Sequence, residues 1–188
     1  MTITRSDIIR VEISPGEMNV VAAHAKLACV GGRSNIRGGD RQATLKNDQL
    51  VGQVGQYVGS LWLFGSPDPY LRSRWVANQN PTVGDGGSDF IGSNIDFKAS
   101  LARNPDRDLL AYRLAVRPKE RHEDWVYVLV LVTEMKPPKP VVAHLIGWAT
   151  DAMLPKRPND SGVFSGAFTI PARDLNPLPP FTWFWRVR

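Results

Sequence analysis

The hydrophobic pattern at the start of the chain predicts a strand followed by a helix. Residues 8–13 alternate between aliphatic and charged side chains, which is typical of a half-buried strand. A helix start follows, because Ser14 can cap it, Pro15 suits its first position and Glu17 completes a capping box. Apolar residues then recur at helical spacing until Gly31-Gly32, where we expect this helix to end.

A second amphipathic pattern predicts a helix that begins at Asn47 or Asp48 and continues to about Leu63. One face is apolar, and the other carries glutamine and serine. The helix contains three glycines, each of which costs about 1 kcal/mol relative to alanine. These are Gly52, Gly55 and Gly59. We therefore expect another backbone, from a sheet or a ligand, to approach the helix closely at these positions.

Shorter apolar or alternating segments predict strands in the rest of the chain. They are residues 71–77, 109–116, 125–133, 141–149 and, as an edge strand, 163–170. The run 125–133 is almost unbroken apolar sequence, which is typical of a central strand covered on both faces. Helices and strands together predict an α/β protein.

Composition and charge narrow the class of protein. The 188 residues, 43% hydrophobic and 22% charged, are typical of one globular domain and exclude a disordered chain. A net charge of +5 favours polyanionic partners. The sequence has no signal peptide and no apolar run of about 18 residues, so we expect an intracellular, cytoplasmic protein without a membrane partner. The single cysteine, Cys29, excludes an internal disulfide and is either a small core residue or a nucleophile.

The stretch 84–98 holds the candidate chemistry. If Gly92-Ser93 forms a two-residue turn, Asp89 and Asp96 lie directly opposite each other on paired strands, about 5 Å apart at Cβ. Lys98 shares their face, because side chains alternate along a strand. Two opposed carboxylates need a cation between them, and a divalent metal is the obvious candidate. The alternative is that Asp96 and Lys98 form only a surface ion pair.

Other sites are excluded by specific positions. No Gly-Lys-Ser/Thr follows a glycine cluster, as a phosphate-binding loop requires. The segment 85–96 has the length of a calcium-binding EF-hand loop, but Phe90 occupies the position of the required glycine. The three histidines, at positions 24, 122 and 144, lack ligand spacing, so we do not expect a zinc site.

The run Gly84-Asp85-Gly86-Gly87-Ser88-Asp89, followed by Ile95-Asp96-Phe97-Lys98, resembles the PD-(D/E)XK nuclease superfamily, in its Mrr-like or related prokaryotic and phage branches. Those proteins carry an acidic residue at a strand end and then Asp/Glu-x-Lys on the paired strand. The resemblance covers about residues 47–150. It implies a restriction-endonuclease-like core in which helices flank a central mixed β-sheet. The single nuclease-like domain, 1–188, would add an N-terminal helix and basic loop (14–46) and a Pro-rich aromatic C-terminal extension (151–188).

The resemblance also implies an activity, that of a Mg²⁺-dependent (or Mn²⁺-dependent) deoxyribonuclease. Asp89, Asp96 and the backbone carbonyl of Phe97 would bind the metal, which would polarise the scissile phosphate and lower the pKa of a bound water. Lys98 would orient or activate that water and neutralise charge developing on phosphorus.

The family often places a glutamate of the preceding helix at the metal site, and here the matching residue is Gln56 or, less readily, Gln53. A glutamine carbonyl can orient a water or a ligand but brings no charge. We therefore expect weaker metal affinity. The alternative function is a catalytically weak or inactive nuclease-fold protein that binds nucleic acid or serves as an assembly subunit.

Two segments could contact DNA. Arg33, Arg37, Arg41 and Lys46 follow the first helix, either as a solvated loop or as an arm that contacts DNA phosphates. The aromatic tail within 177–188 could stack on bases, or it could pack against the core or a partner subunit. Packing against a partner subunit would make the chain a homodimer.

Overall fold

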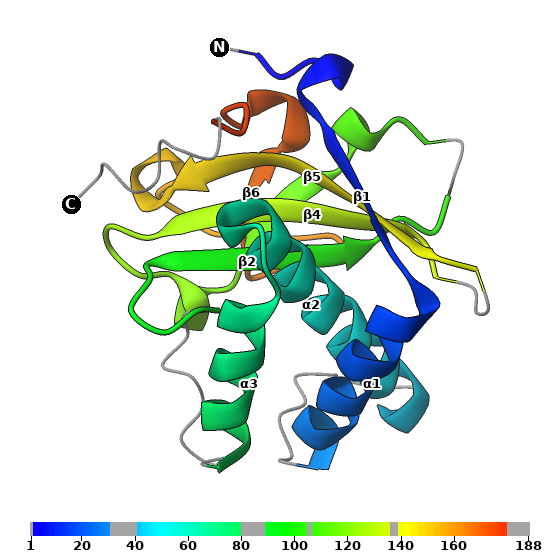
Figure 1. The fold of residues 1–188 in the computed structure, drawn as a ribbon. Helices are drawn as coiled ribbons and strands as arrows, with labels where there is room; N and C mark the ends of the chain where they lie inside the picture. Colours follow the sequence, from blue (N-terminus) through cyan, green and yellow to red (C-terminus); the bar gives the residue numbers. More distant parts are fainter. Residues whose placement is uncertain (1, 31–40, 80–88, 105–106, 136–138, 180–188) are drawn as a thin grey trace.

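The computed structural model describes residues 2–30, 41–79, 89–104, 107–135 and 139–179 (Figure 1). Four strands form the main sheet, in the spatial order β1 (Ile9–Ile13), β5 (Val141–Thr150), β4 (Val126–Glu134) and β2 (Ile95–Leu101). β1 and β4 pair with β5 in antiparallel orientation, whereas β2 pairs with β4 in parallel. The sheet is therefore mixed, and β2 forms one of its edges.

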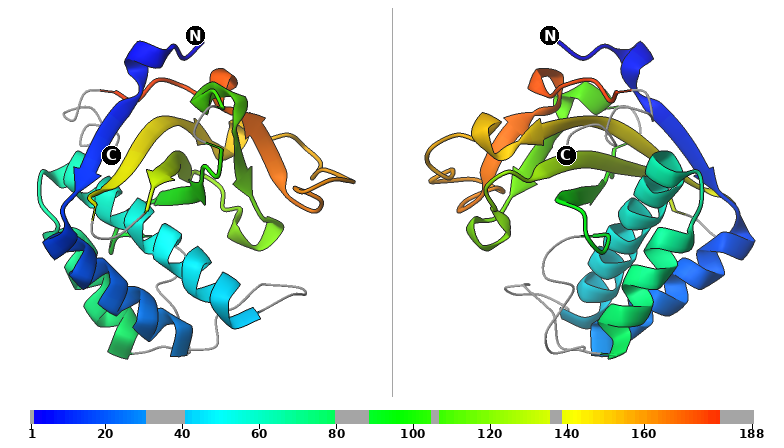
Figure 2. Two further views of the ribbon diagram at one scale, coloured as in Figure 1. Left: turned by 90° about the vertical axis from the view of Figure 1, so that its right-hand side faces the viewer. Right: turned by 60° about the vertical axis from the view of Figure 1, so that its left-hand side comes forward.

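Three helices cover one face of this sheet (Figures 1 and 2). They are α1 (Pro15–Val30), α2 (Arg41–Phe64) and α3 (Asp68–Gln79). The opposite face carries a two-stranded antiparallel ribbon of β3 (Arg113–Val116) and β6 (Phe168–Pro171). The fold is mixed α/β, as predicted, but the three α-helices of the described residues lie on one side of the sheet, and the ribbon occupies the other. None of the helices in the described ranges is both long and apolar enough for a membrane crossing.

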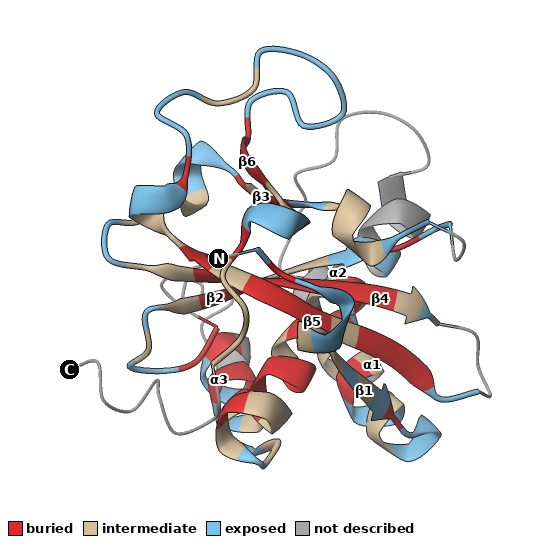
Figure 3. Ribbon diagram, turned by 90° about the horizontal axis from the view of Figure 1, so that it is seen from above, coloured by how far each residue is buried: buried red, intermediate tan, exposed pale blue. Residues whose placement is uncertain are grey.

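β4 is buried on both of its faces, as the unbroken apolar run predicted (Figure 3). Val128, Val130 and Val132 pack into the core on the helix side. Tyr127 and the alternate residues after it pack into a second core under the β3–β6 ribbon. Because side chains alternate across a strand, one strand serves two cores.

α2 approaches β2 at two of its three glycines. A Cβ at Gly59 would lie 2.6 Å from the ring of Phe97, and one at Gly55 would lie 2.6 Å from the Cβ of Ala99. The expected close approach of another backbone is thus confirmed at Gly55, where the backbone of Ala99 lies within 4 Å, whereas at Gly59 the approaching group is a side chain. It is wrong for Gly52, where a Cβ would meet nothing within 4 Å.

Two predictions for the helical layer are corrected by the structure. Residues 71–77 were predicted as a strand but belong to α3. The hydroxyl of Ser66 accepts the N–H of Asp68 at 3.2 Å, and the N–H of Leu71 donates to the carbonyl of Pro67 at 3.0 Å, so a helix forms directly after the proline turn. α2 begins at Arg41, not at Asn47 or Asp48, because helical backbone extends through the residues before those caps.

The predicted strands on the ribbon side are shorter in the structure. In the segment 109–116, a short 3-10 helix (Leu109–Ala111) precedes β3. In the segment 163–170, only the last residues join β6, because the chain before them makes turns with positive φ at Gly162 and Gly166. By contrast, the predicted strands at 8–13, 125–133 and 141–149 are confirmed as β1, β4 and β5.

Candidate functional site

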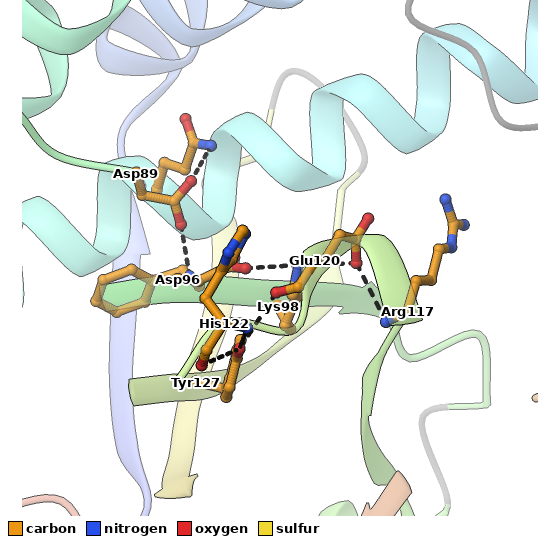
Figure 4. A network of polar contacts seen from close by, with 9 residues as sticks. Asp89, Asp96, Lys98, Arg117, Glu120, His122 and Tyr127 are labelled. Atoms are coloured by element: carbon orange, nitrogen blue, oxygen red, sulfur yellow. Dashed lines mark hydrogen bonds and ion pairs between the residues drawn. The ribbon is translucent and has the colours of Figure 1, made fainter. Parts of the chain in front are cut away.

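The two faces of β2 carry different chemistry. Phe97 and Ala99 face α2, whereas Asp96 and Lys98 lie on the opposite face, beside Tyr127 of the parallel neighbour β4. Lys98 Nζ lies 2.7 Å from Asp96 Oδ2 (Figure 4). The prediction that Asp96 and Lys98 share a face is therefore confirmed, and the pair is largely buried, with 9% and 19% of the two side chains exposed.

Asp89 connects α2 to the edge of β2. One of its carboxylate oxygens accepts a short hydrogen bond from Gln56 Nε2, and the other accepts the N–H of Phe97 at 2.5 Å. Figure 4 shows the Asp89 carboxylate between the helix and the strand. Because β4 pairs with only one side of β2, the other side is open to this side-chain acceptor.

The predicted position of the turn that follows Asp89 is wrong. The N–H of Ser93 donates to the carbonyl of Phe90 at 3.0 Å, so the turn is Phe90–Ser93, one residue earlier than predicted. Gly92 has a φ of 76°, which suits the third residue of a type II turn, not the first central residue of a type II′ turn. The backbone N–H of Asp89 donates to the carbonyl of Ile95 at 3.3 Å, and its side chain reaches the N–H of Phe97, so Asp89 lies near Asp96 without standing directly opposite it in a strand pair.

Burial raises the pKa of Asp89 well above its usual range, and the negative charge of Asp96 raises it further. The Phe97 N–H, the Arg74 guanidinium and the Lys98 ammonium act in the opposite direction but do not outweigh these two effects. Asp89 and Asp96 thus form a buried carboxylate pair that repels itself, and an added cation would relieve this repulsion.

Glu120 is the third carboxylate of the region, and it is not among the site residues predicted from the sequence. It ends a short helix, η3 (Pro118–Glu120), and lies 2.9 Å from Lys98 Nζ. Burial acts to lower the pKa of Lys98, but the charges of Asp96 and Glu120 outweigh it and raise that pKa. Lys98 is therefore a firmly protonated ammonium between two carboxylates. Proline at a helix start with glutamate shortly after was the only sequence signal for this turn.

Tyr127 fastens the turn that carries Glu120 to β4. The N–H of His122 donates to the hydroxyl oxygen of Tyr127 at 2.7 Å. The same hydroxyl lies 3.2 Å from the Glu120 carbonyl and 3.3 Å from the His122 carbonyl, to which it can donate. The backbone of Glu120 itself and of the residues just after it is thereby tied to β4.

The structure places some predicted site residues and not others. Gln56 is brought against Asp89, whereas Gln53 accepts a hydrogen bond from the Tyr70 hydroxyl at 2.9 Å and belongs to the core. Arg33 and Arg37 lie outside the described residues. Arg41 and Lys46 are in α2, but their side chains lie outside the described part, as do the side chain of Cys29 and the tail 180–188.

The side-chain oxygens around Asp89 and Asp96 are of the kind that hard divalent cations prefer. Within the described ranges no group of three or more His, Cys, Asp or Glu side chains could hold a metal ion. The site has two carboxylates, Asp89 and Asp96, so a cation there would need further oxygen ligands. One further oxygen is Gln56 Oε1, which is buried and has no hydrogen-bond partner although the amide nitrogen of the same side chain donates to Asp89. An all-oxygen set of this kind suits Mg²⁺ or Mn²⁺.

Comparisons of the chain with protein-family models, with curated proteins and with solved structures find no match. The chemistry of β2 and its neighbours is therefore the basis for assigning a function. It defines a class of site: a buried carboxylate pair beside a buried ammonium, at the edge of a mixed sheet.

Proposed function

We propose that this chain is a metal-dependent endonuclease that hydrolyses phosphodiester bonds of DNA on a restriction-endonuclease-like core. The observation that carries the proposal is the buried pair Asp89 and Asp96, which repel each other, with Lys98 ion-paired beside them. Carboxylates are costly to bury together unless they serve a cation. A cation next to a protonated lysine is a combination suited to a phosphate group.

Asp89, Asp96 and Gln56 Oε1 are the side-chain oxygens that would hold Mg²⁺ or Mn²⁺, together with the carbonyl of Phe97. When bound, the metal would supply Lewis-acid polarisation of the phosphate and a water of lowered pKa. Gln56 supports the arrangement in a second way, since its amide nitrogen donates to Asp89 and orients that carboxylate.

Lys98 contributes positive charge to the phosphate. An ammonium has three N–H donors, and the two carboxylates at 2.7 and 2.9 Å accept two of them. The third can donate to a phosphate oxygen and stabilise the charge that develops there during displacement. The net charge of +5 and the basic residues within 33–46 would supply contacts to the DNA backbone.

Cleavage assays with supercoiled and linear DNA test the proposal, in Mg²⁺, in Mn²⁺ and in EDTA. Asp96→Asn should reduce metal-dependent cleavage at least about 100-fold, because a metal ligand and the partner of Lys98 lose their charge. Asp160→Asn, a change at an exposed loop residue, is the control and should cleave like the wild type. Cleavage that persists in EDTA or in Asp96→Asn would overturn the proposal.

The second candidate is a nuclease-fold protein that retains nucleic acid without cutting it, and the neutral Gln56 at the carboxylate pair favours it. Gln56→Glu adds a charged ligand, and we expect it to tighten Mn²⁺ binding about tenfold in calorimetry. Unchanged Mn²⁺ affinity would assign Gln56 a purely structural role. DNA retention without cleavage by the wild type would favour this second candidate over the first.

A further inference from the structure

Lys98 Nζ lies between two carboxylates that come from distant parts of the chain. Asp96 Oδ2 is 2.7 Å away on the same strand, and Glu120 Oε2 is 2.9 Å away on η3 (Figure 4). Since Lys98 separates the two acids, Glu120 is placed to act on the lysine and not as a further ligand of a cation held by Asp89 and Asp96.

Glu120 is held more firmly than an ordinary surface residue. Its Oε2 also accepts the N–H of Arg117 at 3.4 Å, and Tyr127 ties the backbone of the turn to β4. Only 29% of the Glu120 side chain and 19% of the Lys98 side chain are exposed. Exposed ion pairs contribute little, but a mostly covered pair on anchored backbone can keep a functional side chain in place.

We propose that Glu120 is a positioning residue that holds the Lys98 ammonium at the site once Asp96 is engaged with a cation. This inference rests on the proposed function. In the metal-free protein Asp96 and Glu120 share the lysine. When the charge of Asp96 is directed to a metal, Glu120 is the carboxylate that keeps Lys98 against the strand, with an N–H left for a phosphate oxygen.

The test compares Glu120→Gln with Glu123→Gln, a charge-matched change at an exposed residue of the same turn. Glutamine keeps an oxygen that can accept the Arg117 N–H, so thermal unfolding should remain close to that of the wild type. We expect Glu120→Gln to lower kcat about 10- to 100-fold, with DNA KM and the Mn²⁺ dissociation constant changed less than about threefold. Glu120→Asp keeps the charge on a shorter side chain, so its kcat should fall between those of the wild type and Glu120→Gln. Glu123→Gln should match the wild type.

A second readout does not depend on cleavage. In nitrogen-15 NMR of the protein in saturating Mg²⁺, the Lys98 ammonium should give a signal protected from exchange with water, and Glu120→Gln should remove that protection while Glu123→Gln retains it. If the wild type cuts DNA and Glu120→Gln changes neither kcat nor this signal, the positioning role is overturned and the nuclease proposal stands. If the wild type does not cut but the signal depends on Glu120, the nuclease proposal falls and the positioning of Lys98 stands. A Mn²⁺ affinity weakened more than about tenfold in Glu120→Gln would overturn the positioning role, because Glu120 would then be a ligand.

Discussion

The two faces of β2 use one strand in opposite ways. On the helix side, Phe97 and Ala99 pack so closely that α2 has glycine opposite each of them. On the other side, Asp96 and Lys98 are charged. Their neighbours are the Glu120 carboxylate and Tyr127, whose hydroxyl holds the turn that carries Glu120. The face toward α2 is therefore packed by apolar contacts, whereas the opposite face carries partly buried charged groups.

This difference shows how an edge strand can carry precise chemistry. With a strand partner on one side only, β2 has fewer backbone bonds to fix it than a central strand has. The close contact with α2 supplies part of what is missing, because a shift of the strand would push Phe97 into the helix backbone. Since faces alternate with a period of two, placing Phe97 also places Asp96 and Lys98.

The largest expected effect comes from removing charge from the polar face. Lys98→Met keeps much of the side-chain volume but leaves Asp89 and Asp96 without their nearest ammonium. We expect metal-dependent DNA cleavage to fall about 10³-fold, and the free energy of unfolding of the metal-free protein to fall as well, because Asp96 and Glu120 lose their counter-charge. Gel assays of initial rates measure the first, and urea unfolding the second. Lys156→Met, at an exposed position, is the control, and a similar loss there would remove the special role of Lys98.

A moderate effect is expected from crowding the apolar face. Gly59→Ala places a Cβ about 2.6 Å from the Phe97 ring, so overpacking outweighs the gain in helix propensity. We expect the free energy of unfolding to fall by about 1–2 kcal/mol, measured by urea unfolding. Gly52→Ala on the same helix meets nothing within 4 Å and should instead stabilise the protein by up to about 1 kcal/mol. Equal effects at both positions would contradict the close contact at Gly59.

The smallest expected effect is a dependence of stability on pH through Asp89, which lies between α2 and the edge of β2. Its pKa is raised by folding, so folded protein binds this proton more tightly than the unfolded chain does. The metal-free protein should therefore lose stability as the pH rises from about 4, the unfolded pKa, through the folded pKa. Asp89→Asn stays neutral, and its amide can donate to the unpartnered Gln56 Oε1.

Urea unfolding of the metal-free wild type and of Asp89→Asn between pH 4 and pH 8 measures this difference. The variant should become the more stable of the two as the pH rises. A gap that stays constant across this range would show that Asp89 does not titrate as inferred.

Periodic segments explain what could be predicted from the sequence. β4 has an apolar run long enough to exclude other interpretations, and the alternation in β1 and the capping box at Ser14 are equally direct. The shared face of Asp96 and Lys98 follows from strand alternation alone. The position of Gln56 came from a resemblance to nucleases, and the structure brings it to Asp89.

The remaining features depend on contacts that a local pattern does not encode. The predicted segment 71–77 is too short to separate helical from strand spacing, and the Ser66 cap lies outside it, two residues before α3 begins. The turn before β2 shifted by one residue because Gly92 can occupy either of two turn positions. Glu120 reaches Lys98 only because β2 and β4 pair in parallel, which brings the turn before β4 beside β2.

The hydrogen bond from Phe97 to Asp89 has a consequence for self-association. An unpaired edge strand offers N–H groups to a strand of another chain, and proteins guard such edges against aggregation. On β2 the Phe97 donor is already taken by a buried carboxylate of the same chain. A neighbouring molecule that extended the sheet here would have to displace the Asp89 carboxylate from the Phe97 N–H and leave it buried without that hydrogen bond. Asp89 therefore protects this edge of the sheet against the addition of another strand.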